Sequence, residues 1–423
     1  MSTLNLQSAT HPKHYLLHKY WGRKAHNLIA ELINAHSKLG DIVLDPYLGS
    51  GVSVIEANKA GRIGFGYDLN PMSALITDVT LTPLDCDQFE KLGQEIIKGM
   101  PHDIEALSLT TCMHCSSQAR YVNAIWDGES LLKVKVKCDA CGTWSADVRK
   151  QDLASASQAV KILSQARSSS RFEFPDPELL RFVRRSGIRN LSGLFSAKNY
   201  LQVAYLHSAI SAIHDSGLRK ALQLAFTSAL PNVSRMIPGD LERVTGKSGW
   251  QISKFWAPRI HTEKDVASSF LARVNKIASG LREIEPLRSN SQFRTFTKSC
   301  TSMQEIDNES VALVIADPPY GDSIAYLGLS MFWNAWVSPV VDYESEIIID
   351  SSRNKTLDVY REGLFESFKE IRRVLKSDGT LVVTFNNRYM KFWQPLIEAI
   401  DSAGFELETL DWVDQAVRSG TQG

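Results

Sequence analysis

Asp41-Ile-Val-Leu-Asp-Pro-Tyr-Leu-Gly-Ser-Gly51 is an apolar run that leads into a turn with two glycines. Val52 to Ala60 then has helical character, and Gly61-Arg-Ile-Gly-Phe-Gly-Tyr-Asp-Leu-Asn-Pro71 contains a second short strand. Strand, glycine turn, helix and strand in this order predict the first unit of an open α/β sheet. Gly49 and Gly51 let the backbone approach a ligand closely and present N–H groups at the start of a helix.

A second apolar run, Val311-Ala-Leu-Val-Ile-Ala316, ends in Asp317-Pro-Pro-Tyr320. The run predicts a buried parallel strand, and open α/β sheets carry their chemistry at the carboxyl ends of such strands. Two consecutive prolines cannot continue a ladder, so the backbone leaves the sheet in a stiff turn with outward carbonyls. The Asp317 carboxylate and the Pro318 carbonyl can each accept one N–H of an exocyclic amino group, and Tyr320 offers a face for a planar base. The alternative is a strand followed by an ordinary Pro-Pro turn.

Asp68 stands at the end of the strand after the glycine turn. In dinucleotide folds an acidic residue about 20 residues beyond the glycines accepts hydrogen bonds from ribose hydroxyls. A glycine pair alone is a weak indication of a ligand site. Together with Asp45 before it, Asp68 after it and Asp317-Pro-Pro-Tyr320 downstream, it indicates a cofactor site beside a catalytic one.

These motifs resemble those of the S-adenosylmethionine-dependent amino-methyltransferases of DNA, with DPYLGSG as the cofactor motif and DPPY as the catalytic motif. The segment from His18 to Ile33 is similar to the part of that family that covers the cofactor. More narrowly, HKYWGRKAHN, Ile188-Arg-Asn-Leu-Ser-Gly-Leu-Phe195 and DPPYGDSIAYLGLSMFWNAW resemble a zinc-ribbon-containing group of adenine-specific DNA methylases. Val52-Ser53 departs from the family, which more often has threonine after the glycines.

The resemblance implies direct methyl transfer from S-adenosyl-L-methionine to the amine of a base flipped out of duplex DNA, in the setting of restriction–modification. Asp317 and Pro318 would orient the amine, and Tyr320 would stack on the base. The implied cofactor residues are Asp45, Pro46, Gly49, Gly51, Asp68 and Asn70, with Tyr20, Trp21 and Lys24 near the methionine end.

The resemblance also implies adenine as the target, because in that family aspartate before the two prolines favours adenine and serine in that place is more usual for cytosine amino groups. An RNA methyltransferase can use the same motifs, since the chemistry of the base pocket does not involve the sugar. A third alternative, from another class, is a non-catalytic DNA-binding subunit whose motifs only retain the cofactor.

Four of the six cysteines form Cys112-Met-His-Cys115 and Cys138-Asp-Ala-Cys141. Two such knuckles complete a tetrahedral thiolate site for zinc, and disulfides are disfavoured in a cytosolic chain. Between them, Leu131-Leu-Lys-Val-Lys-Val-Lys137 predicts a strand with one apolar and one lysine-rich face, as in a zinc ribbon. A closed site of four thiolates has no open position, so we expect a structural role. The isolated Cys86 and Cys300 are expected to be core residues.

The formal net charge is zero, but the charge is unevenly distributed. Residues 151–260 contain 15 Lys or Arg against 7 Asp or Glu, whereas the part after residue 301 is acidic. The basic part is the expected polyanion footprint, and solvated helix faces are the alternative. The candidate phosphate contacts are Arg181, Arg184, Arg185 and Arg189, and the candidate base-stacking residues are Trp250 and Trp256. Both tryptophans can instead seal the loop 239–256 onto the core.

The expected architecture is a doubly wound, Rossmann-like α/β methyltransferase sheet with an inserted zinc ribbon and a mainly helical, basic target-recognition region. The expected divisions are 1–104 for the cofactor-binding half, 105–150 for the ribbon, 151–300 for the recognition region and 301–423 for the catalytic half. No apolar stretch of about 18 residues and no signal peptide is present, so the expected location is cytoplasmic.

Within the recognition region, helical spacing of apolar residues predicts a pair of helices over 197–215 and 217–229, the second broken by Pro231. The last part of the chain predicts strand 311–316, helix 357–376, a stop at 377–379, strand 380–385, helix 392–403 and strand 405–412.

The family fold resembles a seven-stranded sheet with an antiparallel last strand, and no apolar run follows residue 412. Either the chain is truncated or split, or another segment or a protein partner fills that place, since an open apolar edge invites pairing.

Overall fold

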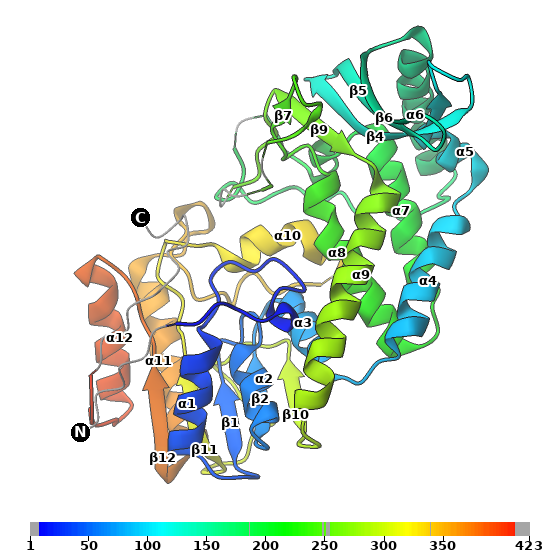
Figure 1. Ribbon diagram of the computed structural model, residues 1–423. Helices are drawn as coiled ribbons and strands as arrows, with labels where there is room; N and C mark the ends of the chain where they lie inside the picture. Colours follow the sequence, from blue (N-terminus) through cyan, green and yellow to red (C-terminus); the bar gives the residue numbers. More distant parts are fainter. Residues whose placement is uncertain (1–7, 186, 248, 251–253, 339, 411–423) are drawn as a thin grey trace. The chain divides into compact units, whose positions relative to one another are not determined.

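The computed structural model describes residues 8–185, 187–247, 249–250, 254–338 and 340–410. The chain divides into two compact units (Figure 1). Unit 1 consists of Met1–Pro83 and Gly280–Gly423, and unit 2 consists of Leu84–Ser279. Among the described residues, no helix has the length and apolarity needed to cross a lipid bilayer.

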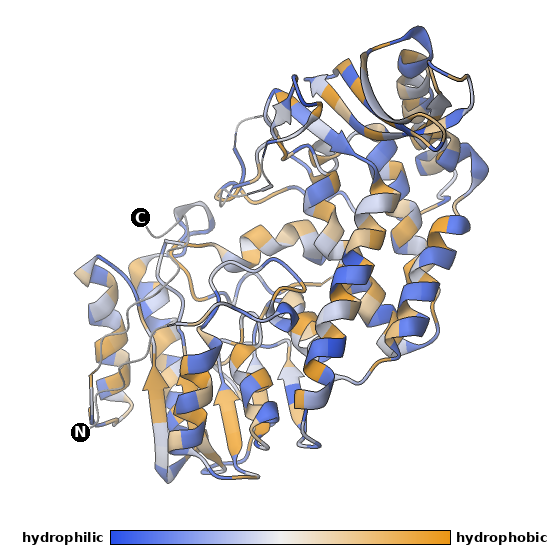
Figure 2. Ribbon diagram, in the orientation of Figure 1, coloured by the Kyte–Doolittle hydropathy of each residue, from blue (hydrophilic) through white to orange (hydrophobic). Residues whose placement is uncertain are grey.

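Unit 1 contains a five-stranded parallel sheet in the order β10-β2-β1-β11-β12 (Figure 1). Figure 2 shows that β1 is largely hydrophobic, as expected for a parallel strand covered on both faces. Every residue of β11 is buried. The strands are β1 (Ile42–Asp45), β2 (Ile63–Tyr67), β10 (Phe293–Phe296), β11 (Val311–Ala316) and β12 (Leu375–Val383).

Helices cover both faces of this sheet because successive strand residues point to opposite sides. Leu44 and Val314 pack toward Phe368 in one core, and Val43 and Leu313 belong to a second core on the other face. The helices of unit 1 are η1 (Lys13–Tyr15), α1 (His26–His36), α2 (Val52–Lys59), α3 (Pro71–Leu81), η4 (Glu285–Leu287), α10 (Tyr326–Val337), η5 (Ser351–Arg353), α11 (Leu357–Val374) and α12 (Met390–Ser402).

The strand order reverses between β1 and β11, which are neighbours although the whole of unit 2 separates them in the chain. From β1 the sheet continues to β2 and β10, and from β11 it continues to β12. Open α/β sheets bind ligands outside the carboxyl ends of the strands at such a reversal. The glycine turn follows β1 and Asp317 follows β11, so both predicted motifs lie at this edge.

Three elements of unit 1 differ from the sequence predictions. β10, in the range assigned to the helical region, joins the sheet beside β2. β12 begins at Leu375, directly after α11, because Leu375 already pairs with Val311. Residues 377–379, the predicted stop, fall within a register shift of this strand, and the pairing resumes between Thr380 and Leu313. The predicted last strand is wrong over 405–410, where the chain forms no strand; residues 411–412 lie outside the described part.

Unit 2 combines an antiparallel sheet, β3-β4-β5-β6, with helices, and β9 pairs with β4 (Figure 1). Its strands are β3 (Leu109–Thr111), β4 (Gln118–Asp127), β5 (Ser130–Cys138), β6 (Gly142–Asp147), β7 (Gly239–Asp240), β8 (Thr245–Gly246) and β9 (Ile260–Lys264). Its helices are α4 (Cys86–Lys98), α5 (His102–Glu105), η2 (Ala106–Ser108), α6 (Lys150–Ser168), η3 (Leu191–Leu194), α7 (Ala197–Ser211), α8 (Ser216–Val233) and α9 (Val266–Ile284), the last of which continues into unit 1.

The predicted helical pair is present as α7 and α8, but Pro231 does not end the second helix. It lies in the last turn of α8, where a missing N–H disrupts little of the remaining helix. β9 comes from the region predicted to be mainly helical and extends the sheet that contains β4 and β5. The predicted ribbon and the predicted recognition region therefore share one sheet.

Candidate functional site

A cavity in unit 1 lies at the carboxyl ends of β1 and β11. It brings together eight of the predicted site residues, namely Tyr20, Lys24, Pro46, Gly49, Asp68, Asp317, Pro318 and Tyr320. Four other predicted cofactor residues do not line it: Trp21, Asp45, Gly51 and Asn70. Trp21 is buried with the Lys19 ammonium 4.1 Å from its ring centroid, whereas the other three support the residues that do line the cavity.

The turn after β1 depends on its two glycines. Gly49 and Gly51 have φ angles of 56° and 82°, which side chains disfavour. A Cβ atom on Gly51 would lie 2.1 Å from the Thr77 hydroxyl, and one on Gly49 would lie 3.4 Å from the Tyr20 ring. The turn is thus shaped by close approach on both sides, and it leads directly into α2.

Asp68 holds this turn in place. Its carboxylate accepts hydrogen bonds from Gly49 N, Asn70 N and the Ser73 hydroxyl, each at 2.9 Å. Burial raises the pKa of Asp68, although the N–H groups of Asn70 and Gly49 favour its charged form. A carboxylate has about four acceptor positions, so one remains for a ligand. Asn70 supports Asp68 from outside the cavity lining: its backbone N–H donates to Asp68, and its side chain caps α3 by accepting from Met72 N.

Lys24 joins the two motifs electrostatically. Its ammonium donates to Asp45 Oδ2 at 2.9 Å and to the Tyr47 carbonyl at 3.0 Å. Although burial alone would lower the pKa of Lys24, Asp45 and Asp317 raise it. Asp45 has no exposed side-chain surface and pairs with Lys24, which lines the cavity.

The turn after β11 carries the Asp317 carboxylate and the Pro318 carbonyl. Tyr320 donates its hydroxyl proton to Asp317 Oδ1 at 2.6 Å, and its ring packs edge-to-face on Phe385. Burial raises the pKa of Asp317, and Lys24 opposes that shift. The carbonyls of Pro319 and Tyr320 accept hydrogen bonds from Tyr360 and Asn387, but no residue in the described ranges donates to the Pro318 carbonyl.

Two stretches of the cavity wall carry no motif and were missed from the sequence. Lys298, Ser299 and Cys300 follow β10, and Ser345 to Ile348 lie between α10 and α11. Tyr326, whose ring stacks on that of Tyr20 at a centroid distance of 6.1 Å, was also missed. The preceding strand β10 gave no clear signal for the first stretch, because the adjacent polar residues of Phe-Arg-Thr-Phe break the alternation of a half-buried strand.

In unit 2 the four predicted cysteines converge. Their sulfur atoms all lie within 4.8 Å of one another, and those of Cys115 and Cys138 are 3.6 Å apart. With zinc–sulfur bonds of about 2.3 Å, a tetrahedral site separates its sulfurs by about 3.8 Å. The cluster therefore fits a zinc ion. Elsewhere in the described ranges no group of three or more His, Cys, Asp or Glu side chains converges in this way.

The basic residues of unit 2 differ in how they are held. Arg184 and Arg189 share the Glu178 carboxylate at 3.3 and 3.2 Å. Arg181 and Arg185 are exposed, and no acidic side chain in the described ranges pairs with either. Both are therefore available to a polyanion.

The two predicted stacking residues also differ. Trp250 is 4% exposed, stacks on Phe255 and donates its indole N–H to the Lys254 carbonyl at 2.9 Å. That position matches the alternative expectation, in which the tryptophan seals the loop. Trp256 is half-buried.

Comparison with known proteins finds similarity in the segments that carry the motifs. A family model described as DNA methylase matches residues 4–77 and 311–419, which both belong to unit 1. The Type II methyltransferase M.MjaII of Methanocaldococcus jannaschii is 30% identical over 76 residues, which are 18% of this chain and 14% of that protein. The Type II methyltransferase M.MthZI of Methanothermobacter thermautotrophicus is 51% identical over 43 residues, 10% of this chain and 12% of that protein. The chain thus spans a small part of the length of either relative, and its mainly parallel α/β sheet is consistent with a methyltransferase fold.

A first prediction concerns Lys24, whose ammonium interacts electrostatically with the carboxylates of Asp45 and Asp317. In Lys24→Met the pKa of Asp317, already raised by burial, is expected to rise further because the opposing charge is gone. The deprotonated carboxylate is the form that accepts N–H bonds, so Asp317 is expected to lose this acceptor capacity at a higher pH than in the wild-type protein. NMR titration of protein with isotope-labelled aspartate, with the Asp317 signal assigned by Asp317→Asn, measures this shift.

The control for Lys24 is Lys376→Met, which removes an ammonium that pairs with Asp41 at 3.3 Å outside the cavity. The titration of Asp317 in this control should coincide with that in the wild-type protein. An Asp317 pKa that is unmoved in Lys24→Met would contradict the electrostatic role of Lys24.

Proposed function

We propose that this protein is an S-adenosylmethionine-dependent DNA methyltransferase that acts on the exocyclic amino group of adenine. The observation that carries the proposal is the turn after β11, where the Asp317 carboxylate and the unpaired Pro318 carbonyl lie in the same cavity as Asp68 and the glycine turn. The similarity to DNA methylases in residues 4–77 and 311–419 supports it.

The acceptors match the chemistry of an aromatic amine. An exocyclic amino group has two N–H bonds, and Asp317 and Pro318 each offer one acceptor for them. With both N–H bonds engaged, the nitrogen lone pair is directed out of the plane of the two acceptors. Catalysis of this kind is positioning and electrostatic stabilisation in a desolvated site. Tyr320, whose hydroxyl is bound to Asp317, would keep the carboxylate oriented while its ring contacts the base.

The cavity also fits the cofactor. The candidate contacts are Asp68 for the ribose, the N–H groups of the Gly49 turn, and Tyr20 and Lys24 near the methionine end. When bound, S-adenosylmethionine supplies an electrophilic methyl group on a sulfonium. Asp45, Asp68 and Asp317 lie in or beneath the cavity, and all three carboxylates act on the ammonium of Lys24, so this part of the site is acidic and suits a cation.

The proposal also specifies the target base, adenine, and the nucleic acid, duplex DNA. Aspartate before the prolines favours adenine over cytosine. A base in a duplex must be flipped to reach a cavity, at a cost of a few kcal/mol. The exposed Arg181 and Arg185 of unit 2 are suited to the phosphate contacts that hold the DNA meanwhile. The cysteine cluster is proposed to hold a structural zinc ion in the sheet of β4 and β5.

The decisive experiment incubates the purified protein and methyl-labelled S-adenosylmethionine with unmethylated duplex DNA, with RNA, or with neither. Nucleoside digestion then identifies the product. Labelled N6-methyl-2′-deoxyadenosine from the DNA sample is the expected result. Label on cytosine or in RNA would replace the proposed substrate, and no transfer to any nucleic acid would refute the proposed activity.

A second prediction tests the DNA footprint in unit 2. Replacing Arg181 and Arg185 together by alanine should weaken binding on every DNA sequence alike, because phosphates carry no sequence information. Each lost phosphate contact reduces the slope of log affinity against log salt by about 0.9, so the double variant should lose a slope of about 2. Fluorescence anisotropy over a salt series gives this slope.

The matched control for the arginine pair is Lys91→Ala with Lys98→Ala, two exposed lysines of α4. It removes the same charge and should leave the slope nearly unchanged. If the slope is unaltered in the arginine variant, the footprint lies elsewhere. The next candidate is then the lysine-rich face of β5, where Lys135 and Lys137 alternate with buried valines.

A further inference from the structure

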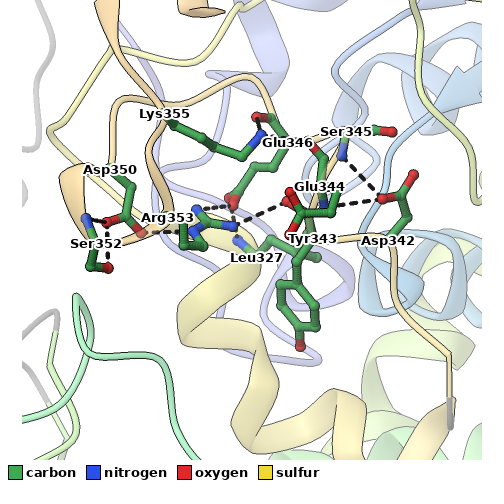
Figure 3. Close-up of polar contacts among 10 residues, drawn as sticks. All are labelled: Leu327, Asp342, Tyr343, Glu344, Ser345, Glu346, Asp350, Ser352, Arg353 and Lys355. Carbon is green, nitrogen blue, oxygen red and sulfur yellow. Dashed lines mark hydrogen bonds and ion pairs between the residues drawn. The ribbon is translucent and has the colours of Figure 1, made fainter.

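One wall of the cavity is formed by a segment that the proposed chemistry does not use. Residues 342–355 connect α10 to α11 and are shown in Figure 3. Ser345, Glu346, Ile347 and Ile348 of this segment line the cavity. The segment lacks regular structure apart from η5, so its shape depends on side-chain contacts.

Arg353 is the centre of those contacts (Figure 3). Its guanidinium donates from Nη2 to Glu346 Oε2 at 2.7 Å, from Nε to Asp350 Oδ2 at 2.7 Å and from Nη1 to the Tyr343 carbonyl at 3.1 Å. The side chains of Arg353 and Glu346 are only 9% and 10% exposed. One planar fork thus fixes three points of the segment, a task for which lysine has no equivalent geometry.

A second cation closes the segment. Lys355 donates to the carbonyls of Glu344 and Glu346, and the backbones of Lys355 and Asp350 exchange two hydrogen bonds at 2.9 and 3.0 Å. At the other end, Asp342 Oδ1 accepts from the N–H groups of Glu344 and Ser345 at 3.0 Å. The shape of the wall is therefore fixed by contacts within the segment itself.

The segment is bonded to the chain that follows the catalytic motif. Glu346 Oε1 accepts from Leu327 N at 3.2 Å, and Ile349 N donates to the Gly321 carbonyl at 3.2 Å. Within the described ranges, no hydrogen bond joins residues 342–355 to the glycine turn or to Asp68. The wall thus belongs with Asp317–Tyr320 rather than with the cofactor motif.

We propose that residues 342–355 form the wall that positions the target base, and that Arg353 is the positioning residue that sets it. The proposal rests on the methyltransferase function proposed above. Arg353 holds Glu346, Glu346 holds the first turn of α10 at Leu327, and Tyr326 and Leu327 line the cavity together with Ile347. These apolar side chains suit the face and edge of a planar base, while the buried ion pair fixes their distance from Asp317.

The test is Arg353→Met, which leaves Glu346 and Asp350 without their cation. A displacement of about 1 Å at a reacting centre costs about 100-fold in rate. The single-turnover methylation rate at saturating DNA and cofactor is therefore expected to fall by about 10- to 100-fold. The cofactor dissociation constant should stay within about twofold, because the wall has no bond to the cofactor motif. Arg353→Lys, which keeps the charge but not the fork, should restore only part of the rate.

The matched control is Arg373→Met in α11. Arg373 also makes several contacts, with Glu370 and with the carbonyls of Met303 and Ile306, but neither it nor these partners line the cavity. Arg373→Met is expected to lower the melting temperature about as much as Arg353→Met does, but to leave the methylation rate unchanged. If Arg353→Met does not fold, Arg353→Lys carries the comparison.

Two results would overturn the proposal. One is a wild-type rate in a folded Arg353 variant. The other is a fall in cofactor affinity that matches the fall in rate, which would assign the wall to the cofactor. Both are distinct from failure of the proposed function, in which the wild-type protein itself transfers no methyl group to DNA.

Discussion

Asp317→Ala is expected to abolish detectable methyl transfer while leaving cofactor affinity within a few fold. The carboxylate is proposed as one of two acceptors for the target amine, and it lies at the end of β11 rather than in the glycine turn. Removal of one preorganised hydrogen-bonding group at a reacting centre costs about 100- to 1000-fold in kcat. Loss of the negative charge, which the Lys24 ammonium attracts and to which Tyr320 donates its hydroxyl proton, adds to this effect. Single-turnover transfer of labelled methyl groups to duplex DNA and calorimetric titration with cofactor measure the two quantities.

The matched control for Asp317 is Asp322→Ala. Asp322 is an exposed carboxylate five positions further along the chain, 4.0 Å from Lys391 and outside the cavity lining. Its removal should leave turnover at the wild-type level. Turnover close to wild type in Asp317→Ala would contradict the catalytic assignment. A parallel loss of cofactor affinity in Asp317→Ala would instead move Asp317 to the cofactor site.

Cys138→Ser is expected to remove one zinc ion per chain and to destabilise unit 2. Cys138 is 2% exposed and belongs, with Cys112, Tyr121, Val134 and Val136, to a hydrophobic cluster of the β4–β5 sheet. Metal binding in small thiolate sites contributes about 10–16 kcal/mol of apparent free energy at pH 7, and this energy is folding energy. Because β9 pairs with β4, the loss should extend beyond the two knuckles. Metal analysis and thermal unfolding give the two readouts.

Cys86→Ser is the matched control, because Cys86 is a buried cysteine of unit 2 that lies outside the cluster. It should retain one zinc ion per chain. The cavity belongs to unit 1, so cofactor affinity is expected to persist in folded Cys138→Ser protein. Protein purified without chelator that contains no zinc would contradict the metal site.

The central strands could be predicted because burial on both faces leaves a continuous apolar signature. β11 matches its predicted bounds, and β1 and β2 lie within theirs. β10 was missed because Arg294 and Thr295 interrupt its apolar character and only its pairing with β2 makes it a strand. The segment after α12 contains the apolar residues expected of a strand, and we predicted one there. In the structure Leu407 is 82% exposed and residues 405–410 form no strand, so an apolar pattern alone did not decide the structure.

The candidate site likewise contains some residues that the sequence could predict and others that it could not. Residues within a motif could be found because their spacing alone brings them to the carboxyl edge of the sheet, as Gly49, Asp68 and Asp317 do. The wall around Glu346 has no spacing rule, since its shape follows from Arg353 contacts that only the folded chain creates. Trp250 is similar, because its burial is decided by packing against Phe255.

The central strands of unit 1, β1 and β11, come from the two separate segments that form this unit, and their separation affects folding during synthesis. β1 cannot acquire its neighbour β11 until all of unit 2 has left the ribosome. Sheets with such distant pairings fold slowly, and their unpaired edges are exposed to aggregation in the meantime. Unit 2, by contrast, is one continuous segment and can complete its own contacts first. We therefore expect the first 83 residues to be the part of a nascent chain that most needs chaperone protection.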